Sequence, residues 1–332
     1  MRGRLEELEI ASRALEGNPL GDPSRRALLV YLPPGHAPER RLPAVYFLHG
    51  MESGVRSWTG FSPFVPSVPE RLDALVAEGR IPPLIGVFPD GFNSLGGTQW
   101  TNSPAVGRYA DYLVEDVLPL VEARFGAIPR PGSRAVVGKS SGGYGALALA
   151  RHRPGTFAHV GVHAADAGFE YCYLPDFPLA AAALLGTDPE AWLREMRRRA
   201  GETKLRGEDH PVLNVIAMAA HYSPRAGAPL GLDLPFEPAT ARIRPEVWAR
   251  WLEHDPVRFV PANPDPFRRL ESLFIDCGTR DEFHLHWGAR MLVESLRAAG
   301  IEVVHEEFED GHRDTGYRFE RSLAYLVPRM ER

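Results

Sequence analysis

The sequence predicts an α/β fold built on an eight-stranded, mostly parallel sheet with helices on both faces. Short apolar runs closed by turn residues alternate with segments of helical periodicity, as in strands joined by crossover helices. Of the 332 residues, 44% are hydrophobic and 24% are charged, which is enough apolar material for a large core. A glycine-rich turn with a central serine also lies where one of these strands meets a helix.

Eight segments have the length and apolar character of strands. The first two are expected to pair antiparallel through the connection at residues 17–25. A helix is expected over Arg108–Phe125, with a kink at Pro119 because proline lacks the N–H that an inner helical turn needs. The expected strands are Leu5–Ser12, Arg26–Leu32, Ala44–Leu48, Leu84–Phe88, Ala135–Gly138, His159–Val162, Leu273–Asp276 and Glu302–Glu307.

A long segment separates the sixth and seventh expected strands, far longer than a usual crossover. We therefore divide the chain into the N-terminal part of the core (1–162), a helical insertion (163–270) and the C-terminal part of the core (271–332). The favoured role of the insertion is a lid over a pocket. The alternative is that its helices only extend the core or form a dimer contact. Helices are expected in it at Pro189–Ala200, Pro211–His221 and Pro245–Leu252.

Charge and composition narrow the classes of partner. The formal net charge is −5 without a long run of like charges, so we expect no binding to nucleic acid. Residues 1–15 lack the apolar core of a signal peptide, and no window is apolar enough to span a membrane. With only Cys172 and Cys277, neither a disulfide framework nor a zinc site is expected. The expectation is a soluble cytoplasmic protein that acts on a small molecule, with a homo-oligomer left open.

The strongest motif is Gly138-Lys139-Ser140-Ser141-Gly142, which follows an apolar strand and precedes a helix. A serine on such a sharp turn needs small neighbours two positions away on each side, and its hydroxyl is lifted clear of the sheet. Ser140 is the expected nucleophile, because Ser141 lacks this arrangement of glycines. A bare turn of this kind could instead hold a phosphate beside Lys139, although the spacing of a P-loop is absent.

Two backbone N–H groups are expected to stabilise the oxyanion. Ser141 N–H lies at the start of the helix that follows the nucleophile, where unpaired donors and the positive end of the dipole meet. Met51 N–H follows His49-Gly50 at the end of an apolar strand, where glycine allows the backbone to face the substrate carbonyl.

His312 is the expected base, because it directly follows the last strand in Asp310-Gly311-His312. The acid that orients it should lie after the strand Leu273–Asp276, and Asp281 is our choice. Asp276 is expected to lie within the strand, and Glu282 to point away from the histidine. Asp166, after the preceding strand, is the alternative acid.

Other polar and aromatic residues are expected at the rim of the site or near it. Trp58, Trp100, Asn102 and Tyr144 lie on segments that could line an acyl or alcohol pocket, but packing alone explains them equally well. The alternating histidines His284 and His286 have no evident third partner, so a helix start with exposed histidines explains them better than a metal site. No metal is assigned.

Together these motifs resemble the putative-esterase family of α/β hydrolases, which includes S-formylglutathione hydrolases, feruloyl esterases, enterochelin esterases and mycolyltransferases. The resemblance covers most of the chain. It implies an α/β-hydrolase fold, a triad at Ser140, His312 and Asp281, and no cofactor. The motifs that carry it are Ser12–Leu15, Val30–Gly35, Leu48-His49-Gly50, Phe88–Gly91, Arg108–Tyr112, Gly138–Gly143 and Asp310-Gly311-His312.

Two departures limit what the resemblance implies. The family commonly has a further glycine run after His-Gly, where this chain has Met51-Glu52-Ser53-Gly54, and the insertion is longer than in compact members. The expected activity is that of a serine esterase that cleaves a carboxylic ester through an acyl-enzyme. The alternatives are an acyltransferase or a thioesterase with the same triad, or a catalytically silent ligand-binding protein.

Overall fold

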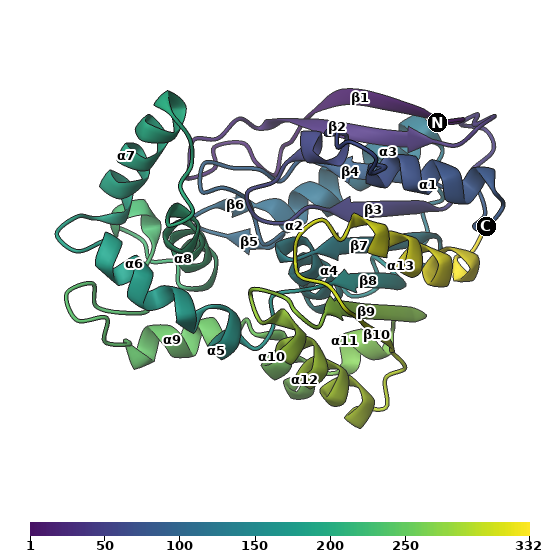
Figure 1. Cartoon of the computed structure of the whole chain (residues 1–332). Helices are drawn as coiled ribbons and strands as arrows, with labels where there is room; N and C mark the ends of the chain where they lie inside the picture. The colour runs from purple at the N-terminus through teal and green to yellow at the C-terminus, as the bar shows by residue number, and fades with distance from the viewer.

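A computed structural model describes the whole chain, Met1–Arg332, and its centre is one eight-stranded sheet (Figure 1). The strand order is β1-β2-β4-β3-β7-β8-β9-β10. The pairs β1–β2 and β2–β4 are antiparallel, and every other neighbouring pair is parallel. The strands are β1 (Arg4–Ala11), β2 (Arg25–Leu32), β3 (Ala44–Leu48), β4 (Ile85–Pro89), β7 (Arg134–Lys139), β8 (His159–His163), β9 (Ser272–Gly278) and β10 (Val304–Phe308).

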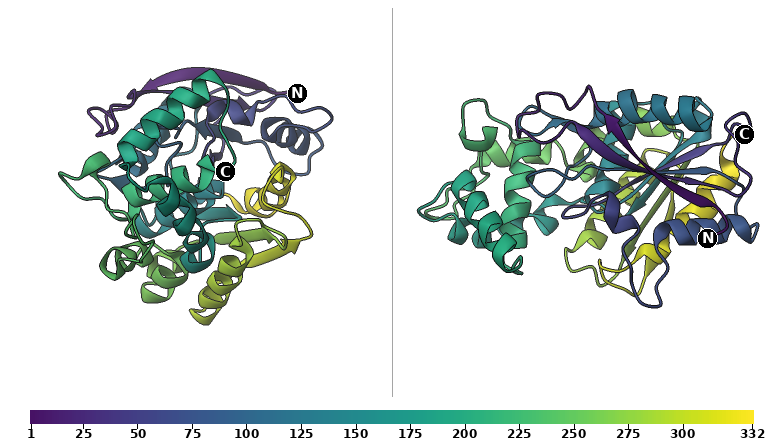
Figure 2. Two further views of the ribbon diagram at one scale, coloured as in Figure 1. Left: turned by 60° about the vertical axis from the view of Figure 1, so that its left-hand side comes forward. Right: turned by 90° about the horizontal axis from the view of Figure 1, so that it is seen from above.

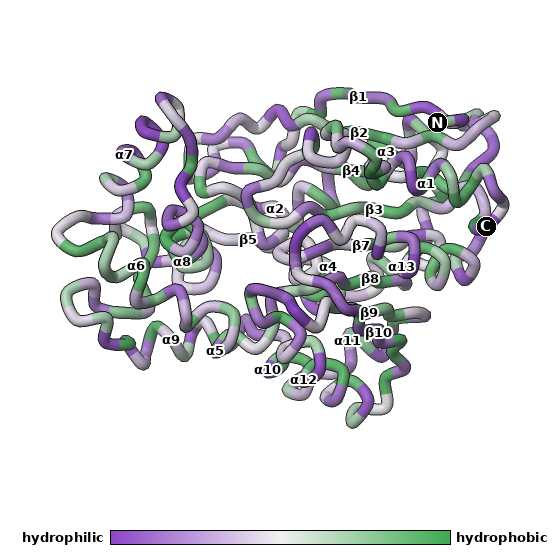
Figure 3. The backbone as a smooth tube through the Cα atoms, in the orientation of Figure 1, coloured by the Kyte–Doolittle hydropathy of each residue, from purple (hydrophilic) through white to green (hydrophobic).

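All eight strands lie within a few residues of their expected positions, and the fold class is confirmed. The reason is visible in their burial: every residue of β3, β4, β8 and β9 is buried. Strands covered on both faces read as continuous apolar runs, which are easy to recognise in a sequence. Figure 3 shows these central strands as largely hydrophobic, whereas the edge strand β1 alternates.

Helices cover both faces of the sheet. On one face α1 and α13 pack against alternate strand residues such as Phe47, Phe88 and Phe274. On the other face α3, α4 and α12 pack against the residues in between, such as Tyr46 and Val136. The helices of the core are α1 (Val68–Ala77), α2 (Tyr109–Asp111), α3 (Leu118–Phe125), α4 (Ser141–His152), α12 (Leu285–Ala298) and α13 (Phe319–Leu326).

Most of the segment between β8 and β9 forms a group of helices at one end of the molecule (Figures 1 and 2), whereas its last two helices, α10 and α11, pack against α12 and α4 of the core. Both chain termini lie at the opposite end of the molecule. This group of helices stands beside the carboxyl ends of the parallel strands. The helices of the whole segment are α5 (Phe169–Cys172), α6 (Phe177–Ala183), α7 (Pro189–Glu202), α8 (Asp209–Tyr222), α9 (Pro245–Leu252), α10 (Pro256–Ala262) and α11 (Asp265–Arg268).

The expected helix over Arg108–Phe125 has three parts in the structure. After α2 the chain forms a π-helical stretch, Tyr112–Val117, and α3 then begins at Leu118. Pro119 occupies the first turn of α3, where its missing N–H costs least. In place of the kink expected at Pro119, the helix changes from π-helical to α-helical just before this residue. A short two-stranded sheet, β5 (Asn102–Ser103) with β6 (Gly107–Arg108), precedes this helix and was not expected.

Within the insertion, the three expected helices correspond to α7, α8 and α9. The short helices α5, α6, α10 and α11 were not expected. They have four to seven residues each, too few for a helical period to be recognised. Across the whole chain, none of the helices combines the length and the apolar character needed to cross a lipid bilayer.

Candidate active site

Ser140 occupies a strained turn between β7 and α4. Its φ and ψ angles are 58° and −128°, and its N–H donates to His163 O at 2.9 Å. A Cβ on Gly142 would lie 2.0 Å from Leu48 O, and one on Gly138 would lie 2.1 Å from Gly142 O. Both glycines are therefore required by close backbone approach. The backbone strain at Ser140 is the kind found at functional sites.

His312 and Asp281 meet at the ends of β10 and β9. His312 Nδ1 lies 2.8 Å from Asp281 Oδ2, and both side chains are buried. Asp281 Oδ1 accepts the backbone N–H groups of Phe283 at 2.9 Å and Leu285 at 3.4 Å. Burial opposes ionisation of Asp281, but the hydrogen bond and charge of His312 and these N–H groups together lower its pKa. An ionised Asp281 accepts the Nδ1 proton, which leaves His312 Nε2 free to act as a base.

The loop that carries His312 is clamped against the end of β9. A Cβ on Gly278 would lie 2.4 Å from Asp310 O, so only glycine allows this contact. Glu282 Oε2 accepts His312 N–H at 2.5 Å, and a Cβ on Gly311 would meet the Glu282 carboxylate at 2.8 Å. The expectation that Glu282 points away from the histidine is wrong. A tight turn at Asp281 directs both successive carboxylates toward the His312 loop, one to the ring and one to the backbone.

The loop after β3 is held in place by His49. Its Nε2 accepts Gly91 N–H at 2.8 Å, so its Nδ1 carries the proton and donates to Gly50 O at 2.9 Å. Burial lowers the pKa of His49, which keeps the ring neutral. A Cβ on Gly50 would lie 3.1 Å from Ser140 Cβ, so this loop lies directly against the nucleophile. Met51 N–H, which follows Gly50 in this loop, has no hydrogen-bond partner in the protein.

Ser141 supplies the first N–H group of α4. The first turn of a helix leaves such donors without partners inside the helix. The two expected oxyanion donors, Met51 N–H and Ser141 N–H, are thus both beside Ser140. The side chain of Ser141 lies elsewhere, because its hydroxyl accepts from Gln99 Nε2 at 2.9 Å and donates to Asp166 at 3.3 Å.

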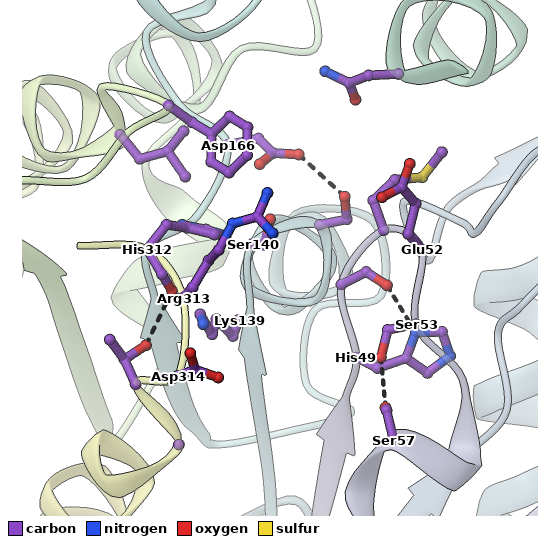
Figure 4. A pocket seen from close by; sticks show the side chains of 18 of the residues that line it. His49, Glu52, Ser53, Ser57, Lys139, Ser140, Asp166, His312, Arg313 and Asp314 are labelled. Atoms are coloured by element: carbon purple, nitrogen blue, oxygen red, sulfur yellow. Dashed lines mark hydrogen bonds between the residues drawn. The ribbon is translucent and has the colours of Figure 1, made fainter. Parts of the chain in front are cut away.

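Ser140 and His312 open into one cavity of about 600 Å³, between the loops of the core and the insertion. Figure 4 shows Lys139, His312, Arg313 and Asp314 on one side of it and the segment from His49 to Ser57 on the other. The structure has no hydrogen bond between Ser140 Oγ and His312 Nε2, and neither atom bonds to any other group of the protein. Such catalytic contacts are often long without substrate and tighten when it binds. The insertion contributes Cys172, Tyr173, His210 and Asn214 to the lining.

Of the four side chains expected at the rim, the structure places one on the cavity. Trp58 lines it. Trp100 is fully buried behind the His49 loop, with Nε1 donating to His49 O at 3.0 Å. Asn102 holds the start of α2 by accepting the N–H groups of Ala110 and Asp111, and Tyr144 packs against Tyr222 and Phe169 in the core. Trp100 and Tyr144 point into the core, and Asn102 is exposed but caps α2, so packing or capping replaces the expected pocket role of these three residues.

Asp166, the alternative acid, makes no bond to His312. It lines the cavity from the end of β8, and Figure 4 shows its carboxylate bonded to a hydroxyl across the site. Its Oδ2 accepts from Tyr173 Oη at 2.9 Å, Gln99 Nε2 at 3.1 Å and Ser141 Oγ at 3.3 Å. Burial raises the pKa of Asp166, although these hydrogen bonds partly oppose the shift. Gln99 lies 67 residues before Asp166 and Tyr173 seven residues after it, and no motif of the sequence pairs either residue with this carboxylate.

Several charged residues of the cavity were also not expected there. Lys139 has no ion pair, and burial lowers its pKa despite the acidic residues around it. His210 of α8 pairs with Glu52 at 3.2 Å, and this contact joins the insertion to the loop after Met51. The loop after Met51 lacks the further glycines that are common in the putative-esterase family. In this chain the ion pair with α8 holds the loop in place. Arg313 and Asp314 follow the base directly, so their proximity could have been read from the sequence.

The structure shows no group of three or more His, Cys, Asp or Glu side chains arranged to hold a metal. His284 is exposed at the residue before α12, as expected for a helix start. His286 differs from the expectation, because it is buried in the first turn of α12 beside Trp287. Asp276 lies within β9 as expected, where it bonds to His163 and Arg318.

Comparison with known proteins places this arrangement in a family. Residues 23–329 match the family described as putative esterase. The chain belongs to the putative esterase family. It is an ester hydrolase with the α/β-hydrolase fold, as the resemblance had predicted.

Solved structures of similar fold extend over nearly the whole chain. A ferulic acid esterase is 18% identical with a TM-score of 0.64, and 99% of each chain is covered. The fluorophosphonate-binding serine hydrolase F of Staphylococcus aureus is 16% identical with a TM-score of 0.60, covering 98% of each chain. An S-formylglutathione hydrolase from Agrobacterium tumefaciens is 16% identical with a TM-score of 0.58, covering 99% of this chain and 96% of that one. At these identities the likeness concerns the fold, not the substrate.

Proposed function

We propose that Ser140, His312 and Asp281 form the catalytic triad and hydrolyse a small-molecule carboxylic ester. In this reaction His312 Nε2 takes the proton of Ser140 as its Oγ attacks the ester carbonyl. The N–H groups of Met51 and Ser141 stabilise the oxyanion. The protonated His312 then gives its proton to the leaving alcohol, and an acyl-enzyme remains. Water activated by the same ring releases the acid. The residues need no cofactor for these steps.

One observation supports this assignment most strongly. The bond between His312 Nδ1 and Asp281 fixes the histidine with Nε2 unbonded, on the same cavity as the strained Ser140. The other buried pair of this kind, His163 with Asp276, differs because His163 Nε2 bonds to Ser322 and neither residue lines the cavity. Thioester cleavage and acyl transfer use the same three groups, and no contact in the structure favours either of them.

The size of the cavity supports a substrate larger than a simple acetate. A space of about 600 Å³ is in the range of sites that bind small molecules. Its lining combines apolar side chains, among them Trp58, Phe283 and Leu285, with the polar groups described above. The insertion supplies part of this lining, so we propose that it helps to select the substrate.

The experiment that tests the function compares two adjacent serines. Hydrolysis of short p-nitrophenyl esters should fall by at least about 10³-fold in Ser140→Ala, because the nucleophile of a triad enzyme is lost. Ser141→Ala is the matched control: it keeps the backbone N–H and removes a hydroxyl that bonds to Gln99 and Asp166. We expect it to keep most of the activity. Equal losses in both variants, or activity that survives in Ser140→Ala, would contradict the proposal.

We further propose that the enzyme works in the cytoplasm. Its two cysteines, Cys172 and Cys277, are both buried and free, so no disulfide contributes to its stability. A protein of this kind suits a reducing compartment. Fractionation of the source cells should recover the esterase with cytoplasmic markers, and recovery from the culture medium or the periplasm would contradict this.

A further inference from the structure

Asp166 is a buried carboxylate on the cavity that the reaction above does not use. It is 7% exposed, and it forms no ion pair with any Arg, Lys or His side chain. All three of its hydrogen bonds, from Gln99, Tyr173 and Ser141, go to Oδ2. Oδ1 accepts none, yet it is not among the atoms that the protein shields completely. One oxygen is thus held by the protein, and the other is left open on the cavity side.

The protein supplies no donor for Oδ1, so this oxygen accepts from water or from a ligand in the cavity. A buried carboxylate is stable only when its oxygens accept hydrogen bonds or pair with a cation. Three donors fix the plane of the Asp166 carboxylate, so Oδ1 has a defined direction. Water alone would not require this orientation, whereas recognition of a particular ligand group does. The missing partner is a hydrogen-bond donor.

The position of Asp166 relates this oxygen to the reaction. Its Oδ2 is 3.3 Å from the hydroxyl of Ser141, the residue next to the nucleophile. Asp166 and Ser140 line the same cavity, so one bound ester can contact both residues.

We propose that Asp166 Oδ1 is a subsite for a hydroxyl or ammonium group of the substrate, so that the preferred ester carries a hydrogen-bond donor. This proposal rests on the proposed function, because it concerns the substrate of that same site. Methyl ethers and unsubstituted analogues cannot donate to Oδ1, and they leave it desolvated without a partner. Binding sites that recognise a donor discriminate strongly against analogues that lack it.

The test uses esters of 3-phenylpropanoic acid that differ in one group on the ring: hydrogen, hydroxyl, methoxy or aminomethyl, at the 3- and 4-positions. A parallel set carries the same groups on the alcohol and an acetyl on the other side. We expect one donor-bearing ester to exceed its methoxy or unsubstituted partner by about 10- to 100-fold in kcat/KM, which is the range of a hydrogen bond to a charged group.

Two variants assign that preference to Asp166. In Asp166→Asn the amide oxygen must face the three donors, so an NH₂ group faces the cavity in place of Oδ1. An ammonium substrate should lose its whole advantage, whereas a hydroxyl substrate should keep part of it, because a hydroxyl also accepts hydrogen bonds. Asp255→Asn is the matched control, since Asp255 is a buried aspartate of the insertion that accepts the N–H groups of Gly168 and Phe169 and does not line the cavity. Its preference among the esters should equal that of the unaltered enzyme.

Calorimetric binding of the same esters to Ser140→Ala separates this proposal from the proposed function. Tighter binding of a donor-bearing ester, lost when Asp166→Asn is added, would support the subsite even if turnover were absent. Equal dissociation constants across the panel, or a preference that Asp166→Asn leaves unchanged, would overturn it. If the unaltered enzyme does not hydrolyse these esters but Ser140→Ala retains the binding preference, the result would count against the esterase mechanism alone.

Discussion

Two buried aspartates at the same edge of the sheet have opposite surroundings. Asp281 follows β9 and Asp166 follows β8, and they are 2% and 7% exposed. Asp281 lies behind His312, with an imidazole and two backbone N–H groups as partners, and its pKa is lowered. Asp166 faces the cavity with neutral donors on one oxygen, and its pKa is raised. The comparison teaches that the partner, not the residue type or the position after a strand, decides what a carboxylate does here.

The largest expected difference between the two aspartates is in catalysis. Asp281→Asn should lower kcat by about 10⁴-fold, because the amide favours the wrong tautomer of the histidine, as in other serine triads. Asp166→Asn should change kcat by less than tenfold for esters without a donor group. Steady-state kinetics with one p-nitrophenyl ester checks both. Comparable losses in the two variants would remove the distinction between them.

The next effect concerns the contact that holds the two loops of the triad together. Gly278→Ala adds a Cβ that would lie 2.4 Å from Asp310 O, so the His312 loop must shift away from Asp281. We expect kcat/KM to fall by about 10- to 100-fold, since a displacement of about 1 Å has this cost in other active sites. The control is Gly60→Ala, where an added Cβ would make only ordinary van der Waals contacts, and we expect its kcat/KM to be unchanged. Full activity in Gly278→Ala would show that the loop is not clamped.

A smaller effect is expected at Glu282, which bonds to the backbone of His312. Glu282→Ala removes this acceptor and should reduce kcat several-fold with little change in KM, because substrate binding does not involve it. Its side chain is exposed, so the hydrogen bond is partly replaced by water. Glu309→Ala changes a neighbouring exposed glutamate without such a bond. Activity measured for the two variants side by side should separate them, and an identical effect would argue against a positioning role.

The smallest effect is on stability, and its sign differs between the two aspartates. The lowered pKa of Asp281 contributes stability above the ordinary value of 3.8, and this contribution is lost as pH falls through the folded pKa. The raised pKa of Asp166 works the other way: its stabilising contribution is present below 3.8 and is lost as pH rises through the folded pKa. At pH 7 we therefore expect Asp281→Asn to lower Tm and Asp166→Asn to raise it, each by about 1–3 °C.

Thermal unfolding of the three proteins from about pH 8 to about pH 2.5 checks these signs. The gap between Asp166→Asn and the unaltered protein should close first, above pH 3.8, and the gap of Asp281→Asn, of opposite sign, should close only below pH 3.8. A gap that stays constant with pH would mean that packing, and not ionisation, causes the difference.

The positions of the buried strands and of the triad residues could be predicted from the sequence. Buried strands such as β3 and β8 are continuous apolar runs, so their positions were predictable. The serine turn was predictable because close backbone approach demands glycine at 138 and 142. His312 and Asp281 followed from their places after strands, and their hydrogen bond agrees with the predicted pairing.

What the sequence could not give depends on contacts between distant segments. Asp166 accepts a hydrogen bond from Gln99, which lies 67 residues away in the chain, and nothing near Asp166 indicates this partner. Glu282 bonds to the His312 loop because the chain turns tightly after Asp281, so that successive side chains do not point in opposite directions as they would in a strand. Trp100 and Tyr144 belong to the same category, since the sequence alone does not distinguish an aromatic residue that lines a cavity from one that fills the core.

The central claim is that Ser140 is the one nucleophile of this cavity, and covalent labelling tests it most directly. The folded protein is incubated with a fluorophosphonate, and the modified peptide is identified by mass spectrometry. We expect one adduct per chain, on Ser140, and none in Ser140→Ala or after the protein is unfolded. An adduct on Ser141, or no adduct on folded protein that binds esters, would contradict the account.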